Sequence, residues 1–214
     1  RGAVSVQACA YWHAPAHALV SLAHADSAAA ITLLPRFVAH PRAQVREYAA
    51  RAATQLRDAG APRHLAGDSN DNVRESAVAG LAQVQRHTAD SVFLAALESS
   101  GYQVVIAAAA ALAGSRHPAA VPALLDALDR LSAQRRENSR DPRIAILARL
   151  AELGAELDAP RLEPYLADFD STVATRTADL LSTWKARRVA AHAAPLAIRS
   201  EPLLETFTSS GLQL

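Results

Sequence analysis

Three histidines near the N-terminus have a spacing that could bind zinc. His13, His17 and His24 are four and seven residues apart, which would place three imidazoles on one side of a helix. The helix of a zinc protease also needs a glutamate directly after its first histidine, and Ala14 stands there instead. Pro15 suits the first turn of an ordinary helix. The sequence therefore favours a plain helical segment, and we predict neither a metal nor a cofactor.

Side chains for covalent or acid–base catalysis are present, but not in catalytic patterns. Cys9 is the only cysteine, and no G-x-S-x-G turn surrounds any serine. Two carboxylate pairs have helical spacing, namely Asp126 with Asp129 and Glu152 with Glu156. Pairs of this kind usually lie on a solvated helix face. We therefore predict no catalytic residue and no enzymatic activity for this chain.

The arginines fall into two groups. Arg46 and Arg74 occupy the same place in two similar phrases, so we expect both to make structural hydrogen bonds to neighbouring turns. A second group consists of Arg135, Arg136, Arg140 and Arg143. Acidic residues interrupt that group and no aromatic residue is interleaved for base stacking, so we expect a solvated loop. Nucleic-acid binding is the less favoured alternative.

Overall composition indicates a helical protein without a strong electric field. Of the 214 residues 50% are hydrophobic but only 5% aromatic, which fits a core of Ala, Leu and Val between closely packed helices. The formal net charge is +1. No apolar run approaches the roughly 18 residues that a membrane span needs. The chain begins at Arg1 and holds no methionine, so we expect a piece of a longer protein and predict no compartment.

One phrase occurs twice and indicates the elements that position these side chains. Residues 43–56 read AQVREYAARAATQL and residues 71–84 read DNVRESAVAGLAQV. Alignment places Val45 over Val73, and the apolar residues that follow recur at helical spacing. Each phrase therefore predicts an amphipathic helix with a valine at the start of its buried stripe.

The same stripe predicts three more helices. They read YQVVIAAAAALAG, DPRIAILARLAELG and DSTVATRTADLLSTW, with anchors at Val104, Ile144 and Val173. The longest step between anchors coincides with the polar stretch 132–142, which indicates an inserted loop.

Shorter apolar segments precede these helices, so each repeat is expected to be a helix pair. A single pair cannot bury its stripe, whereas stacked pairs share one core. We predict an all-α fold, a right-handed α-solenoid of about five stacked helix pairs, over residues 1–188. Residues 1–26 are expected to form a partial repeat or cap, and residues 189–214 a linker-like tail.

The repeated unit D-x-x-V-R-x-x-A-x-x-A-L, preceded by helices such as LLPRF and VPALLDAL, resembles HEAT repeats of the short, phycobilisome-lyase-like variety over about residues 27–185. The motif arginine is replaced by Val105, Ala145 and Ala174 in the last three copies. This resemblance implies a scaffold that binds a partner protein or peptide on a concave surface.

A second resemblance concerns residues 179–205. This run is similar to the end of the helical region in bacterial proteins that join HEAT repeats to a cyclophilin-type peptidyl-prolyl isomerase domain, where Pro195 and Pro202 would suit the linker. The alternative function implied is a substrate-recruiting or spacer region of such an isomerase.

The expected partner surface follows from the helical geometry. Residues two, six and nine positions after each anchor should point away from the core. In the third and fourth repeats these residues are apolar, which predicts an exposed strip flanked by aromatic and basic side chains. The predicted partner-binding residues are Tyr48, Arg51, Ile106, Ala110, Ile146, Arg149 and Leu150. Three alternatives remain open, because a neighbouring helix, a second copy in a homodimer or an incorrect register would each hide the strip.

Overall fold

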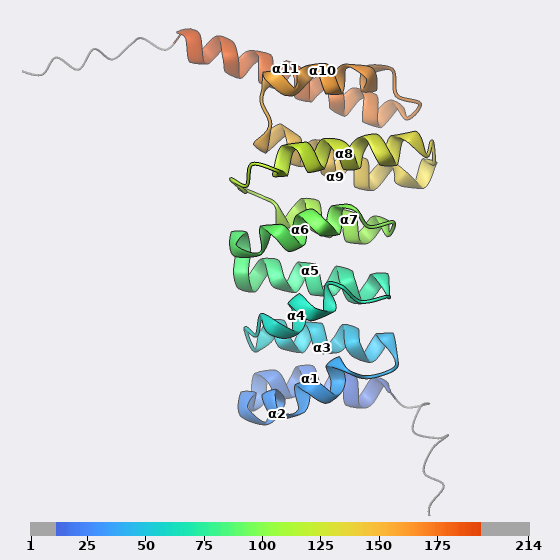
Figure 1. Cartoon of the computed structure of the whole chain (residues 1–214), viewed down its shortest axis with the longest axis vertical. Helices are drawn as coiled ribbons and strands as arrows, with labels where there is room; N and C mark the ends of the chain where they lie inside the picture. The colour runs from blue at the N-terminus through green and yellow to red at the C-terminus, as the bar shows by residue number, and fades with distance from the viewer. Residues whose placement is uncertain (1–11, 194–214) are drawn as a thin grey trace, which may run out of the picture.

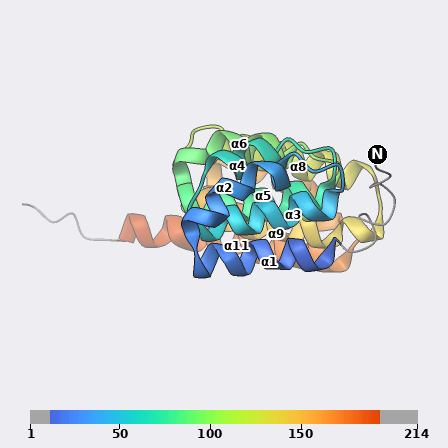
Figure 2. The ribbon, with the colours of Figure 1, turned by 90° about the horizontal axis from the view of Figure 1, so that it is seen from below.

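The protein is a stack of helix pairs (Figure 1). The computed structural model describes residues 12–193, and these contain helices and turns but no strand. Each pair has a first helix in one layer and a second helix that forms the other layer (Figure 2). The first helices are α2 (Ser27–Val38), α4 (Gly60–Leu65), α6 (Asp90–Leu97), α8 (Ala120–Ala133) and α10 (Ala159–Leu162), the last continued by a 3-10 turn at Glu163–Ala167.

The second helices pack against one another in chain order. They are α3 (Ala43–Gln55), α5 (Asp71–Gln85), α7 (Tyr102–Ala111), α9 (Arg140–Leu153) and α11 (Ser171–Ala193), and α1 (His13–Ala25) precedes them in the same layer. The prediction of an all-α solenoid with about five helix pairs is confirmed. Helix α1 packs on α2 and α3, as a partial repeat would.

Small residues allow the second helices to approach closely. Ala49, Ala77 and Ala108 occupy equivalent positions in three of them and are fully buried. Gly80 of α5 faces α3, where an added Cβ would lie 2.1 Å from Oγ1 of Thr54. The high alanine content thus serves the packing of adjacent helices rather than helix propensity alone.

The register of the fourth repeat differs from the prediction. The residue three positions after each N-cap starts the buried stripe, and in the five second helices this residue is Val45, Val73, Val104, Pro142 and Val173. The expected anchor Ile144 is only half-buried. Pro142 is tolerated because it lies in the first helical turn, where backbone N–H groups have no intrahelical partner.

The polar stretch 132–142 is mostly not an inserted loop. Helix α8 continues to Ala133, a 3-10 turn spans Glu137–Ser139, and α9 begins at Arg140. The longer step between repeats therefore comes mainly from a long α8, not from irregular chain.

Arginine–aspartate pairs join successive repeats. Nε of Arg46 lies 2.6 Å from Oδ2 of Asp68, and Nη1 of Arg143 donates to both carboxylate oxygens of Asp168 at 2.8 Å. Each aspartate precedes the next second helix and also accepts a hydrogen bond from the backbone N–H two residues later. Arg143, which we expected in a solvated loop, is completely buried, and it rather than Ala145 occupies the motif position.

The other two junctions have weaker versions of this link. Arg74 donates to Oγ of Ser99 at 3.2 Å and pairs with Asp71 of its own helix. Val105 stands where α7 would need an arginine, and near the start of α7 Tyr102 donates a neutral hydrogen bond of 3.2 Å to Gln134, while Arg149 of α9 donates to the carbonyl of Ala109 further along. The expectation that Arg46 and Arg74 have structural roles is confirmed.

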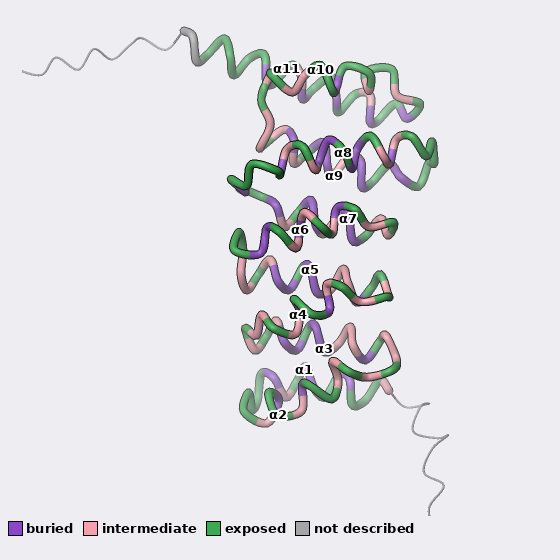
Figure 3. The backbone as a smooth tube through the Cα atoms, viewed as in Figure 1, coloured by how far each residue is buried: buried purple, intermediate pink, exposed green. Residues whose placement is uncertain are grey.

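Buried residues recur along the whole stack (Figure 3), and the hydrophobic ones form two groups that meet within α5. One group extends from Leu19 of α1 to Ala77, and the other from Val78 to Trp184 of α11. Adjacent residues of a single helix therefore belong to different cores.

The predicted domain boundary lies inside a helix, because α11 continues past residue 188 to Ala193. Cys9 and the proposed linker prolines Pro195 and Pro202 lie outside the described residues, so the linker and its isomerase context stay predictions. Within residues 12–193 no helix combines the length and apolarity that crossing a bilayer would require.

Candidate partner-binding surface

Apolar side chains lie on the outer side of α7 and α9, in positions that correspond between the two helices. Ile106 and Ile144 come two residues after their anchors, and Ala110 and Ala148 come six residues after them. Both isoleucines are half-buried and both alanines are exposed. Together with Ala151 they form what we call the apolar strip. Since α7 and α9 pack side by side, the strip crosses from one repeat to the next.

Two predicted residues of this surface are instead in the core. Ile146 and Leu150 have no exposed area and belong to the buried group around α8 and α11. The cause is the shift in register, because the correct anchor Pro142 lies two residues before Ile144. Ile144 and Ala148 take the outer positions that we had given to Ile146 and Leu150.

The surroundings of the strip contain little charge. Helix α7 has no acidic or basic residue along its whole length. At the other end of the strip, a cavity of about 350 Å³ opens between α9 and α11. Ile144, Ala148 and Ala151 line one side of it, and Arg176 and Asp179 of α11 lie at its wall. The surface is thus an apolar band that ends at two charged side chains, Arg176 and Asp179.

Arg149 lies beside the strip but is engaged in packing. Its Nε donates to the carbonyl oxygen of Ala109 at 2.8 Å, and its Nη1 pairs with Glu152. Glu152 in turn accepts a hydrogen bond of 2.7 Å from the N–H of Gly114. Arg149 therefore ties α9 to α7, which fixes the two halves of the strip relative to each other.

Tyr48 and Arg51 form a separate aromatic cluster. The guanidinium of Arg51 lies 5.0 Å from the centre of the Tyr48 ring, whose hydroxyl is 3.0 Å from Nε2 of His17. Trp12 approaches the same ring edge-on at 6.2 Å. Helix α5 lies between this cluster and the strip, so the two do not touch.

The three N-terminal histidines do not converge on one point. His17 bonds to Tyr48, His13 stacks on Trp12 at 3.6 Å, and His24 is exposed near the end of α1. Within the part of the chain that the structure describes, no three potential metal ligands gather.

The carboxylate pair Asp126 and Asp129 is not simply solvated. Both aspartates of α8 bind Arg161, and the hydroxyl of Tyr165 donates to Asp129. Burial, followed by the hydrogen bond to Asp129, raises the pKa of Tyr165 above its ordinary value. This network ties α8 to the last repeat.

Comparison with known proteins supports the fold assignment. The family model described as HEAT repeats matches residues 63–141, which confirms the resemblance in that region. The chain is also similar to the crystal structure of an engineered protein from the Northeast Structural Genomics Consortium, with a TM-score of 0.52 and 23% sequence identity over 80% of this chain and 90% of that one. That similarity concerns the fold alone. No curated protein matches the chain.

Proposed function

We propose that this HEAT-repeat chain is a non-enzymatic scaffold that binds a partner protein along the apolar strip. The observation that carries the proposal is the uncharged helix α7, whose outward Ile106 continues into Ile144 of α9. A helix without charge on its outer side is normally covered by another surface. HEAT repeats commonly serve as interaction scaffolds, which agrees with this assignment.

The strip lies in the layer that favours binding of an extended or helical segment. The second helices contact each other continuously, whereas the backbones of the first helices approach each other closely only at α2–α4 and α6–α8, and α8 reaches α10 through long side chains. Tighter packing in one layer favours curvature toward that layer, which would make the strip part of a concave surface. Apolar side chains of a partner segment would then fit between successive second helices.

The test is an affinity capture from the source organism with residues 1–214 as bait. We expect the double variant Ile106→Asp/Ile144→Asp to lose a specific partner while keeping its helical circular dichroism, since both side chains are partly exposed. The matched control is Ile31→Asp on α2, where the isoleucine is 56% exposed in the other layer. A partner that is retained by the strip variant, or lost equally with Ile31→Asp, would contradict the proposal.

A further inference from the structure

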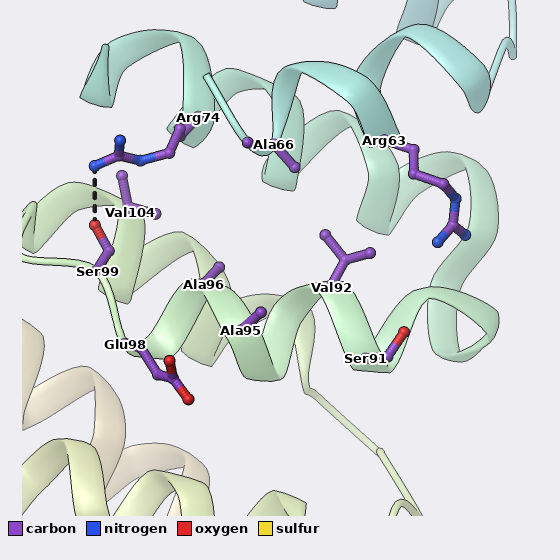
Figure 4. A pocket seen from close by; sticks show the side chains of 11 residues that line it. Arg63, Ala66, Arg74, Ser91, Val92, Ala95, Ala96, Glu98, Ser99 and Val104 are labelled. Atoms are coloured by element: carbon purple, nitrogen blue, oxygen red, sulfur yellow. Dashed lines mark hydrogen bonds between the residues drawn. The ribbon is translucent and has the colours of Figure 1, made fainter. Parts of the chain in front are cut away.

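The layer of first helices is interrupted at its second member. Helix α4 has six residues, whereas its neighbours in this layer, α2 and α6, have 12 and eight. A cavity of about 560 Å³ lies where a longer helix would run alongside α6, between α4 with the loop after it on one side and α6 on the other (Figure 4). We call it the α4–α6 groove.

Apolar side chains form the middle of the α4–α6 groove. Val92, Ala95 and Ala96 of α6 point into the space, and Ala66 faces them from the end of α4 (Figure 4). Val104, at the start of α7, contributes one wall and is completely buried. The middle of the groove therefore suits small apolar side chains rather than a charged group.

Each end of the groove has an arginine and a serine. Arg63 and Ser91 lie at one end, and Arg74 and Ser99 at the other (Figure 4). Arg63 donates only to the neutral amide oxygen of Gln85, and no carboxylate among the described residues pairs with it. At the opposite end, Arg74 is joined to Ser99 and to Asp71.

Among the described residues, the cation that has no ion-pair partner within the groove is the guanidinium of Arg63. Glu98 is the acidic side chain of the lining, and it points away from the space between the two arginines (Figure 4). Asp71 already pairs with Arg74. The guanidinium of Arg63 is therefore the cation whose N–H donors can bind an acidic group of a ligand.

We propose that the α4–α6 groove binds a short acidic segment of a partner protein, in helical form, which completes the layer of first helices. The apolar face of the segment would pack on Val92 and Ala96, and an aspartate or glutamate would accept hydrogen bonds from Arg63. This groove lies in the layer opposite to the apolar strip, so the inference does not depend on the function proposed above.

The probe is a phage-displayed library of random 16-residue peptides, selected on the full chain 1–214. We expect the selected peptides to share one or more acidic residues together with apolar residues at a spacing of three and four. Their dissociation constants are then measured by fluorescence anisotropy with synthetic copies.

Two variants change the groove in different ways. Arg63→Glu reverses its free charge, and Ala95→Trp fills its middle without altering the charge; each should weaken binding by about tenfold or more. The control is Arg36→Glu, an exposed arginine that lines a different cavity beside Trp12 and Phe37, and it should change binding by less than about twofold. Circular dichroism checks that all three variants remain folded.

Several results would overturn the proposal. These are a library that yields no binding peptide, selected peptides without acidic residues, binding that survives both groove variants, and an equal loss with Arg36→Glu. The groove could instead be filled by a second copy of this chain, which sedimentation of the wild-type protein tests. A dimer that Arg63→Glu dissociates would mean that a second copy occupies the groove.

Discussion

Arg143 shows how a charged residue can belong to the core of this protein. Its side chain is completely buried, its Nη1 meets both oxygens of Asp168 at 2.8 Å, and its guanidinium lies 4.5 Å from the centre of the Phe169 ring. Burial of an ion pair gives little net stability, but removal of one partner leaves an uncompensated charge.

We therefore expect Asp168→Asn to lower the free energy of unfolding by about 3 kcal/mol, measured by urea titration. The double variant Asp168→Asn/Arg143→Met should recover part of this loss, because it removes the orphaned charge. Glu47→Gln is the control, since its pair with Arg51 is partly exposed on one helix and should cost about 0.5 kcal/mol. Equal effects of Asp168→Asn and Glu47→Gln would show that burial of Arg143 is unimportant.

The pair between Arg46 and Asp68 predicts a dependence of stability on pH. The hydrogen bond from Arg46 lowers the pKa of Asp68 below its ordinary value, so the folded state binds a proton less readily than the unfolded chain. This contribution is fully present above the unfolded pKa of about 4 and is lost as the pH falls through the folded value.

Urea titrations at pH 7 and pH 3 measure this effect. We expect the wild type to lose more stability on acidification than Asp68→Asn, whose amide can still accept from the N–H of Asn70 but cannot be protonated in this range. An identical loss in the two proteins would mean that Asp68 does not contribute to acid sensitivity.

At the scale of the helix, close approach is fixed by single small residues. Gly80 allows α5 to lie against Thr54 of α3, with no room for a Cβ in the present arrangement. We expect Gly80→Ala to destabilise the protein by about 1–3 kcal/mol in thermal or urea unfolding.

The companion variant Thr54→Ala removes the obstructing Oγ1 and should restore most of that loss in the double variant. Because Gly80→Ala alone improves helix propensity, a stabilised single variant would show that α3 and α5 can separate without cost.

Prediction from sequence succeeded where the apolar stripe was regular. Val45, Val73 and Val104 gave correct registers because each begins a run of small apolar residues at helical spacing. The register of the fourth repeat was predicted wrongly, because its buried stripe contains Pro142 and Arg143. Sequence alone does not assign these two residue types to a core. The spacing from the N-cap would have been the better guide, since it is three residues in all five second helices.

The short α4 was not predicted either. Its six residues, GAPRHL, contain a glycine and a proline and are too few for a detectable period. The α4–α6 groove, which depends on that brevity and on the placement of Arg63 and Arg74 at its two ends, therefore could not be inferred before the helices were placed in space.

For the whole molecule, contacts between neighbouring repeats make stability local. The two buried groups of side chains have only helix α5 in common. Unfolding of the helices around one group therefore need not unfold the helices around the other. We expect Ala49→Asp, which places a charge at a fully buried site of α3, to abolish amide hydrogen-exchange protection in α1–α4 while α8–α11 stay protected.

Exposed Ala79→Asp on α5 is the control and should leave protection unchanged throughout. If Ala49→Asp removed protection from all helices together, the solenoid would unfold as one cooperative unit.

The junction between α7 and α9 has mechanical significance. Val105 leaves one end of this junction without an arginine link, and the neutral bond between Tyr102 and Gln134 lies there, whereas Arg149 ties the helices through the carbonyl of Ala109. The two ends of this joint are then tied unequally, and Ile106 and Ile144 lie across it. A partner bound across both isoleucines would bridge the two repeats. Binding would therefore make the solenoid harder to bend at this junction, as well as occupy its surface.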